Sequence, residues 1–213
     1  MTEKNKVLWS EGLFLRPQHF QQQERYIEHL LDDRVRALNP FGYGFLDIQI
    51  DSDMLKHGKV AIAVARGVMP DGSLVDIPSE ASMPEQLEVP LDCKNAVIAL
   101  TLPYRRMGMP EMSYKTTKDI LLRYEGADQS VANSLIEHDG LADIKIGRLN
   151  FKLQLLSEVT PGYCAIGFLR VVERRSTGQV VIDDEYIPPV MDCRASPRLY
   201  GYLKEVEGLL KHR

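Results

Sequence analysis

The chain has 213 residues, of which 44% are hydrophobic and 26% are charged, and its formal net charge at pH 7 is −4. This composition is typical of a globular protein with one domain, or one domain and an appendage. The acidic balance argues against nucleic-acid binding, which usually needs a basic surface, and no apolar run reaches the length of a membrane span.

An apolar arm precedes the first predicted helix. It contains the chain's single tryptophan, Trp9, followed by Leu13, Phe14 and Leu15. Pro17 suits the first turn of a helix, because its fixed φ is already helical and its missing N–H would have no partner there. Such an arm must bury against the rest of the chain or against another chain. Since aromatic residues anchor interfaces, the arm is a candidate binding surface; the alternative is that Trp9 fixes the arm to its own domain.

Residues 18–38 are predicted to form an amphipathic helix. Apolar residues recur in steps of three, four and seven from Phe20 to Leu38, while polar residues occupy the opposite face. Asn39 and Pro40 end the helix, because the residue before a proline avoids the α region. Residues 1–38 are therefore assigned to an N-terminal arm and helix. The apolar stripe either covers the domain's own core or also meets another subunit.

Residues 39–189 are predicted to form a β domain. Alternating or continuous apolar runs predict strands at 46–50, 59–69, 73–77, 96–102, 144–155 (two strands with a kink near Gly147), 163–173 and 179–183. Pro70-Asp71-Gly72 is a turn between two of them. The remaining segments are read as a polar loop at 107–118, a strand edge at 119–124, and a short helix or a loop at 125–140. Short strands without strand–helix alternation predict a mainly β fold, an antiparallel β-sandwich or a barrel, and we adopt the sandwich.

Residues 190–213 are predicted to begin a helical neck. Ser196 is a good N-cap and Pro197 a good first helical residue. A heptad-like seam follows, and we expect it to mediate self-association; it consists of Leu199, Leu203, Val206 and Leu210. Because the seam runs to the last residues without a C-cap, we expect the helix to continue in a longer protein. The alternative is a final helix that folds back on the sandwich.

No pattern predicts a catalytic, cofactor or metal site, and we expect a protein that is not an enzyme. The histidines lack the ligand spacing of a metal site and are expected at the surface or at helix caps; they are His19, His29, His57, His138 and His212. Asp51-Ser52-Asp53 begins like a calcium loop, but its later ligand positions are missing. Gly42-Tyr43-Gly44 lacks the third glycine of a dinucleotide-binding turn.

The cysteines and the acidic residues also argue against catalysis. Cys93, Cys164 and Cys193 are odd in number and widely spaced, so we expect three buried thiols in a reducing, cytoplasmic compartment. His138 and Asp139 have the chemistry of a general-base pair, but no nucleophile can be named for the hydrolase that this pair would imply.

Two short motifs resemble a known family. Residues 8–26 read LWSEGLFLRPQHFQQQERY, and residues 184–189 read DEYIPP. Both are similar to sequences in the N-terminal region of TssK, the baseplate subunit of the type VI secretion system, and they occur in the same order. The segment 107–141 departs from the family by being longer and more polar than expected.

This resemblance implies a fold and a set of partners. In the family, the N-terminal part resembles the β-sandwich shoulder domain of tailed-phage receptor-binding proteins, and it leads into a helical neck and a C-terminal head. The resemblance implies a trimer that joins the TssF–TssG wedge, with TssL and TssM contacted only through the head, which this chain lacks. It assigns baseplate and subunit contacts to the first motif, here Leu8, Trp9, Phe14, Leu15, His19 and Phe20. The alternative is a phage-like β module that binds a receptor or ligand.

Overall fold

The computed structural model describes residues 4–106, 108–113, 121–134 and 140–211. The chain forms two compact units, Met1–Gly42 and Tyr43–Arg213. The first unit contains the arm and one long helix, α1 (Pro17–Leu38). Its start at Pro17 and its end before Asn39 confirm the sequence prediction, and the N–H of Asn39 closes the last turn on the carbonyl of Val35 at 2.8 Å. No residue of α1 is buried within this unit.

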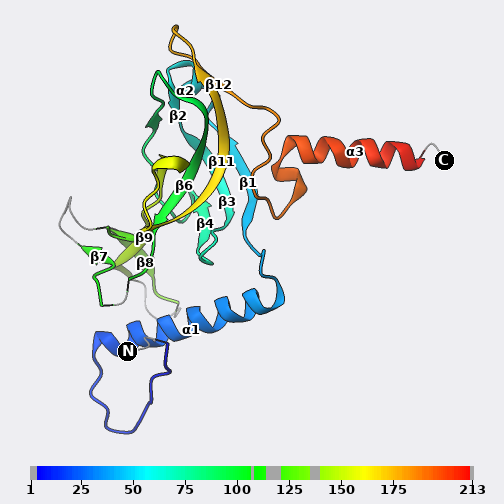
Figure 1. Ribbon diagram of the computed structural model, residues 1–213. Helices are drawn as coiled ribbons and strands as arrows, with labels where there is room; N and C mark the ends of the chain where they lie inside the picture. The colour runs from blue at the N-terminus through cyan, green and yellow to red at the C-terminus, as the bar shows by residue number, and fades with distance from the viewer. Residues whose placement is uncertain (1–3, 107, 114–120, 135–139, 212–213) are drawn as a thin grey trace. The chain divides into compact units, whose positions relative to one another are not determined.

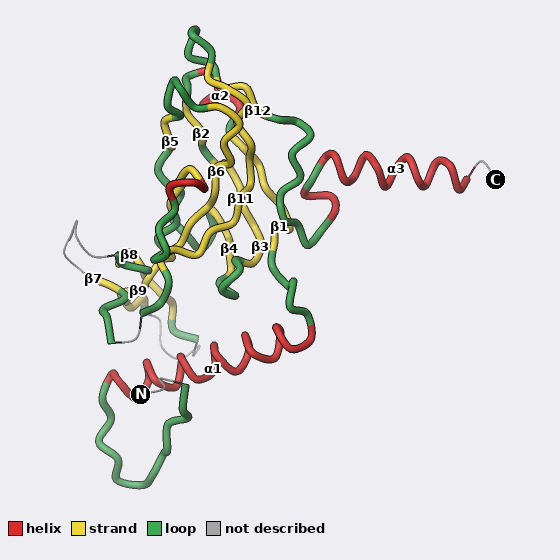
Figure 2. The backbone as a smooth tube through the Cα atoms, in the orientation of Figure 1, coloured by secondary structure: helices red, strands yellow, loops and turns green. Residues whose placement is uncertain are grey.

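The second unit is mainly β, as predicted, and is built on two antiparallel sheets (Figures 1 and 2). The first sheet has the order β1-β3-β4, and its strands are β1 (Gly44–Ile50), β3 (Ile62–Val68) and β4 (Leu74–Ile77). The second has the order β10-β6-β11-β12, and its strands are β6 (Lys94–Pro103), β10 (Lys152–Leu155), β11 (Tyr163–Arg174) and β12 (Val180–Ile182). The predicted turn at 70–72 connects β3 to β4, and Gly72 supplies the positive φ.

One hydrophobic core joins the two sheets. Phe45, Ile62 and Ile77 from the first sheet belong to the same buried cluster as Leu100 and Val171 from the second. All five side chains are at most 1% exposed. Burial of apolar surface on this scale is the dominant favourable term in folding, so the sandwich is the stable body of the molecule.

Shorter elements complete the second unit. Two small sheets pair β2 (Lys59–Val60) with β5 (Leu87–Glu88), and β7 (Met112–Ser113) with β8 (Tyr124–Ala132) and β9 (Leu141–Leu149). The helical pieces are α2 (Ser52–Lys56), η1 (Leu156–Glu158), η2 (Cys193–Ala195) and α3 (Pro197–Lys211). None of the helices described is long and apolar enough to cross a membrane.

The structure corrects the predicted pattern in the segment 125–140. Most of its described part is a strand, β8, which pairs residue by residue with β9 from Tyr124–Leu149 to Ala132–Leu141. The β8–β9 ribbon is largely exposed, so its sequence carries no buried-face alternation from which a strand could be read. The break between β9 and β10 also lies at residues 150–151 and not at Gly147, because the N–H of Asn150 turns to the carbonyl of Arg123 at 2.9 Å.

Bulges alter which side chains face the core. A register shift between Phe45 and Asp47 turns Leu46 outward, although period-2 alternation placed it with Ile48. A second shift, between Gly167 and Leu169, buries Leu169 beside Phe168. The predictions at 107–118 and 119–124 lie partly outside the described residues; their described part includes β7.

Candidate functional site

The arm carries two of the most exposed apolar side chains of the first unit. Leu8 and Phe14 are 87% and 80% exposed, and Leu15 is about half exposed. Trp9 instead packs within the unit, with its ring centroid 6.3 Å from those of both His19 and Phe20. The ring contacts hold the arm against the start of α1 and leave Leu8, Phe14 and Leu15 facing outward. Exposed apolar residues gathered on one segment are typical of an interaction surface.

Two hydrogen bonds fix the arm's path. The backbone N–H of Arg16 donates to His19 Nδ1 at 3.0 Å, and Gln22 Nε2 donates to the carbonyl of Asn5 at 2.7 Å. The first bond satisfies a backbone donor at the helix start, which helps to define where α1 begins. His19 therefore has a capping role within the chain, and its imidazole orients the arm.

Backbone hydrogen bonds attach the end of the second motif to the β domain. The N–H of Phe45 donates to the carbonyl of Pro189, and the N–H of Met191 donates to the carbonyl of Phe45, both at 2.9 Å. Val190 thereby pairs with Phe45 in a parallel bridge beside β1. Gly44 has a φ of 141°, and a Cβ there would lie 2.9 Å from the carbonyl carbon of Val190. This close approach of two backbones requires glycine.

Side chains before the prolines attach the motif to β11. The guanidinium of Arg170 lies 5.0 Å from the ring centroid of Tyr186 and 3.3 Å from the carboxylate of Asp183. Burial raises the pKa of the Tyr186 hydroxyl, and Gly167 leaves room for that hydroxyl on the strand. The motif is thus held on two sheets, so that the helix following it begins from a fixed point.

The predicted seam lies on α3 and is exposed. Ser196 is buried and its hydroxyl accepts the N–H of Leu199 at 3.4 Å, which confirms the predicted helix start. Leu199 is half-buried, whereas Leu203, Val206 and Leu210 are at least half exposed. An amphipathic helix with an uncovered apolar stripe is a surface that another helix can cover.

The residues considered for chemistry have structural roles. Asp51 caps α2 by accepting the N–H of Asp53 at 2.9 Å. Cys93 and Cys164 are buried as predicted, and burial raises the pKa of Cys164 to about 11. Cys193 is exposed, so the expectation of three buried thiols was wrong. It lies in the short 3₁₀ helix η2.

Three residues that were considered from the sequence lie outside the part of the chain that the structure describes. They are His138, Asp139 and His212.

One residue of structural importance could not be found from the sequence. Arg123 is 8% exposed, and its guanidinium donates to the Asp71 carboxylate at 3.0 Å, to the carbonyl of Pro103 at 2.7 Å and to the hydroxyl of Ser73. It thus joins the β3–β4 turn to the end of β6. Its partners are 20 to 52 residues away in the chain, and no local pattern marks such a contact.

Exposed apolar side chains lie on α1 in the first unit and on α3 in the second, and such surfaces are typical of interaction sites. A family described as "Bacterial Type VI secretion, VC_A0110, EvfL, ImpJ, VasE" matches residues 19–213. The whole chain is 38% identical to the type VI secretion system baseplate component TssK1 of Pseudomonas aeruginosa and covers 48% of that protein. The chain belongs to this family.

Solved structures agree with the fold. A crystal structure of TssK is similar with a TM-score of 0.92 at 32% identity, covering 98% of this chain and 47% of that one. A cryo-electron microscopy structure of a TssK–TssF–TssG baseplate subcomplex contains a similar chain, with a TM-score of 0.88. The match covers 99% of this chain and 70% of that one, and at 23% identity it shows the fold alone. The chain spans about half the length of the curated relative and of the TssK crystal structure.

Proposed function

We propose that this chain is a non-enzymatic structural part of a cytoplasmic type VI secretion baseplate subunit, and that it joins the TssF–TssG wedge. The observation that carries the proposal is the arm, in which Leu8 and Phe14 are almost fully exposed on a chain of this family. A relative of the same fold is part of a complex with TssF and TssG, which supports this choice of partner. Contacts to TssL and TssM would belong to the half of the protein beyond this chain.

The geometry of the arm supports a division of roles among the proposed partner-binding residues. We assign direct contact to Leu8, Phe14, Leu15 and the exposed edge of Phe20, and a supporting role to Trp9 and His19. Burying an exposed leucine or phenylalanine side chain contributes about 1.5–3 kcal/mol, so a few such residues suffice for a stable contact. A test of the arm must therefore separate residues that contact the partner from residues that support the arm.

The test is co-purification of the chain with TssF and TssG from the same organism. We compare Phe14→Ala and the double variant Trp9→Ala, Phe14→Ala with a control, Leu74→Ala, which removes an exposed leucine from β4. Loss of an aromatic anchor typically costs 2 kcal/mol or more, so co-purified TssF and TssG should fall by roughly tenfold or more. Far-UV circular dichroism checks that α1 and the sandwich remain folded.

The outcomes separate the alternatives. Loss of binding in Phe14→Ala but not in the control supports the arm as the interface. Equal binding by all variants returns the arm to a structural role, and absence of binding by the unsubstituted chain contradicts the wedge assignment for this half of the protein.

The α3 seam is proposed as the self-association surface, in a trimer of the longer protein. Leu203, Val206 and Leu210 would form its buried stripe. Replacing Val206 with Asp in the full-length protein should reduce the mass measured by light scattering to that of one chain. An unchanged mass would show that the trimer forms elsewhere.

A further inference from the structure

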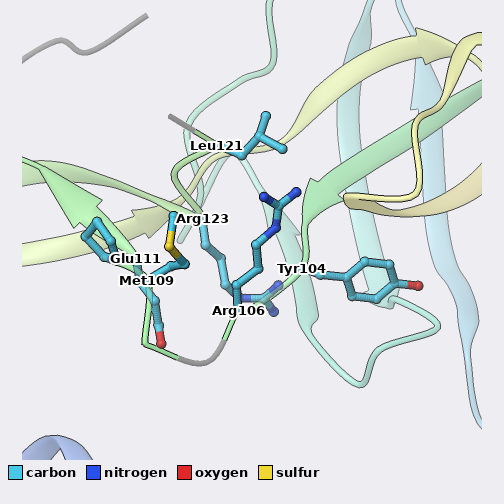
Figure 3. Close-up of a pocket in the computed structure, with 7 residues that line it drawn as sticks. Tyr104, Arg106, Met109, Glu111, Leu121 and Arg123 are labelled. Atoms are coloured by element: carbon cyan, nitrogen blue, oxygen red, sulfur yellow. The ribbon is translucent and has the colours of Figure 1, made fainter. Parts of the chain in front are cut away.

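A small cavity lies in the second unit, at the end of β6 (Figure 3). Its volume is about 230 Å³, and its lining combines two arginines with apolar and aromatic side chains: Tyr104, Arg106, Met109, Pro110, Glu111, Leu121 and Arg123. This volume is smaller than the roughly 300–1,000 Å³ of cofactor-sized sites. The cavity therefore suits one short side chain or small ion and not an extended ligand.

The acidic groups around the cavity are already paired. The Glu111 carboxylate lies 3.1 Å from Nε of Arg105, and the Asp71 carboxylate lies 3.0 Å from Nη1 of Arg123. Arg123 still has a buried Nε without a hydrogen-bond acceptor. Among the residues that the structure describes, no carboxylate lies within ion-pair distance of Arg106. Counted over the described residues, the lining of the cavity thus has one positive charge in excess, in a chain whose formal net charge is −4.

The lack of a side chain at Gly162 makes room for the guanidinium of Arg106. A Cβ on Gly162 would collide with Nη2 of Arg106 and lie 3.0 Å from Cδ1 of Leu121. The guanidinium therefore lies over the backbone of Gly162, next to Leu121, and Figure 3 shows it directed toward Leu121. A guanidinium against an apolar wall presents its N–H groups in the planar fork that matches a carboxylate.

We propose that this cavity binds a carboxylate on a short aliphatic stem, the side chain of a glutamate or aspartate from a partner protein. A single uncompensated guanidinium matches a single negative charge, whereas a phosphate would bring nearly two. Met109, Leu121 and Tyr104 provide apolar surface for the stem. The choice of a protein partner rests on the proposed adaptor role, but the site itself is tested without any baseplate component.

The experiment titrates the full chain with N-acetyl-glutamate amide and follows the arginine Nε–Hε signals by ¹⁵N NMR. The neutral isostere N-acetyl-glutamine amide and inorganic phosphate are titrated in parallel. Two variants disturb the site, Arg106→Gln by removing the charge and Gly162→Ala by displacing the guanidinium. Arg66→Gln, which removes an exposed arginine from β3, is the matched control.

A saturable shift of the Arg106 signal with the glutamate probe, absent with the glutamine probe, is the expected result. Affinity should fall about tenfold or more in Arg106→Gln, as for loss of a charge-assisted hydrogen bond, and remain unchanged in Arg66→Gln. If Arg106→Gln fails to fold, Gly162→Ala must show the same loss. Equal shifts with both amides, no saturable shift, or tighter binding of phosphate would overturn the assignment. None of these results depends on TssF or TssG, so failure here is distinguishable from failure of the proposed function.

Discussion

Removing Arg123 should destabilise the β domain strongly. Its guanidinium and the Asp71 carboxylate form an ion pair at 3.0 Å, with side chains only 9% and 12% exposed, and it also donates to the carbonyl of Pro103 at 2.7 Å. In Arg123→Ala the Asp71 carboxylate keeps only the N–H of Ser73 as a donor, at 3.1 Å, and loses the charge that balances it. The carbonyl of Pro103 loses the guanidinium donor. Breaking a buried pair in this way typically costs about 3–5 kcal/mol.

The magnitude can be measured as a shift in melting temperature. For a domain of 150–250 residues each kcal/mol corresponds to roughly 2–4 °C, so Arg123→Ala should melt roughly 6–20 °C lower. The assay is thermal unfolding followed by far-UV circular dichroism. Trp9 fluorescence is unsuitable, because the only tryptophan lies in the first unit.

Two further variants test the cause of the loss. Arg123→Met combined with Asp71→Asn removes both charges, and should recover part of the stability because no isolated charge remains buried. Arg175→Ala removes one side of an exposed pair, 3.9 Å from Glu173, and should change stability by about 1 kcal/mol or less. An Arg123→Ala variant that melts within about 2 °C of the unsubstituted chain would refute the reasoning.

Two other predictions follow from the described residues. A thiol reagent should modify Cys193 quickly in the folded protein but reach Cys93 and Cys164 only after denaturation, since both are buried and burial raises the pKa of Cys164 to about 11; equal modification rates would contradict the structure. Gly44→Ala should lower the melting temperature more than Gly178→Ala. Both glycines have positive φ, but only at position 44 would the added Cβ also lie 2.9 Å from neighbouring backbone. Equal losses in melting temperature would show that this close approach is unimportant.

The elements with local signals were predictable from the sequence. Both long helices begin at a proline, and α1 ends before Asn39-Pro40, as the capping and proline rules require. The strands of the sandwich were found because burial imposes apolar patterns on their sequence. Strand β8 was missed for the complementary reason, since an exposed two-stranded ribbon buries no regular face, whereas most of β9 lay within the strand predicted at 144–155.

Features that depend on distant contacts were not predictable. Two bulges, at Leu46 and at Leu169, changed which residues face the core, and the sequence contains no marker for either. The Arg123 contacts join three separate segments. The hydrogen bond between Phe45 and Pro189 joins residues more than 140 positions apart in the sequence, and it became apparent only in the folded chain.

The candidate surfaces were identified more fully than their internal contacts. Aromatic content singled out the arm, and the heptad steps singled out α3. The roles within the arm needed geometry: Trp9 packs on Phe20, His19 receives a backbone N–H, and Phe14 faces outward.

Site-specific photo-crosslinking in assembled baseplates tests whether the arm contacts the TssF–TssG wedge. Phe14 is replaced by p-benzoylphenylalanine in the full-length protein, with Leu74 replaced in the same way as the control. We expect position 14 to crosslink to TssF or TssG and position 74 not to do so. Crosslinks from position 14 only to the same chain, or equal yields from both positions, would contradict the assignment of the arm as the wedge-binding surface.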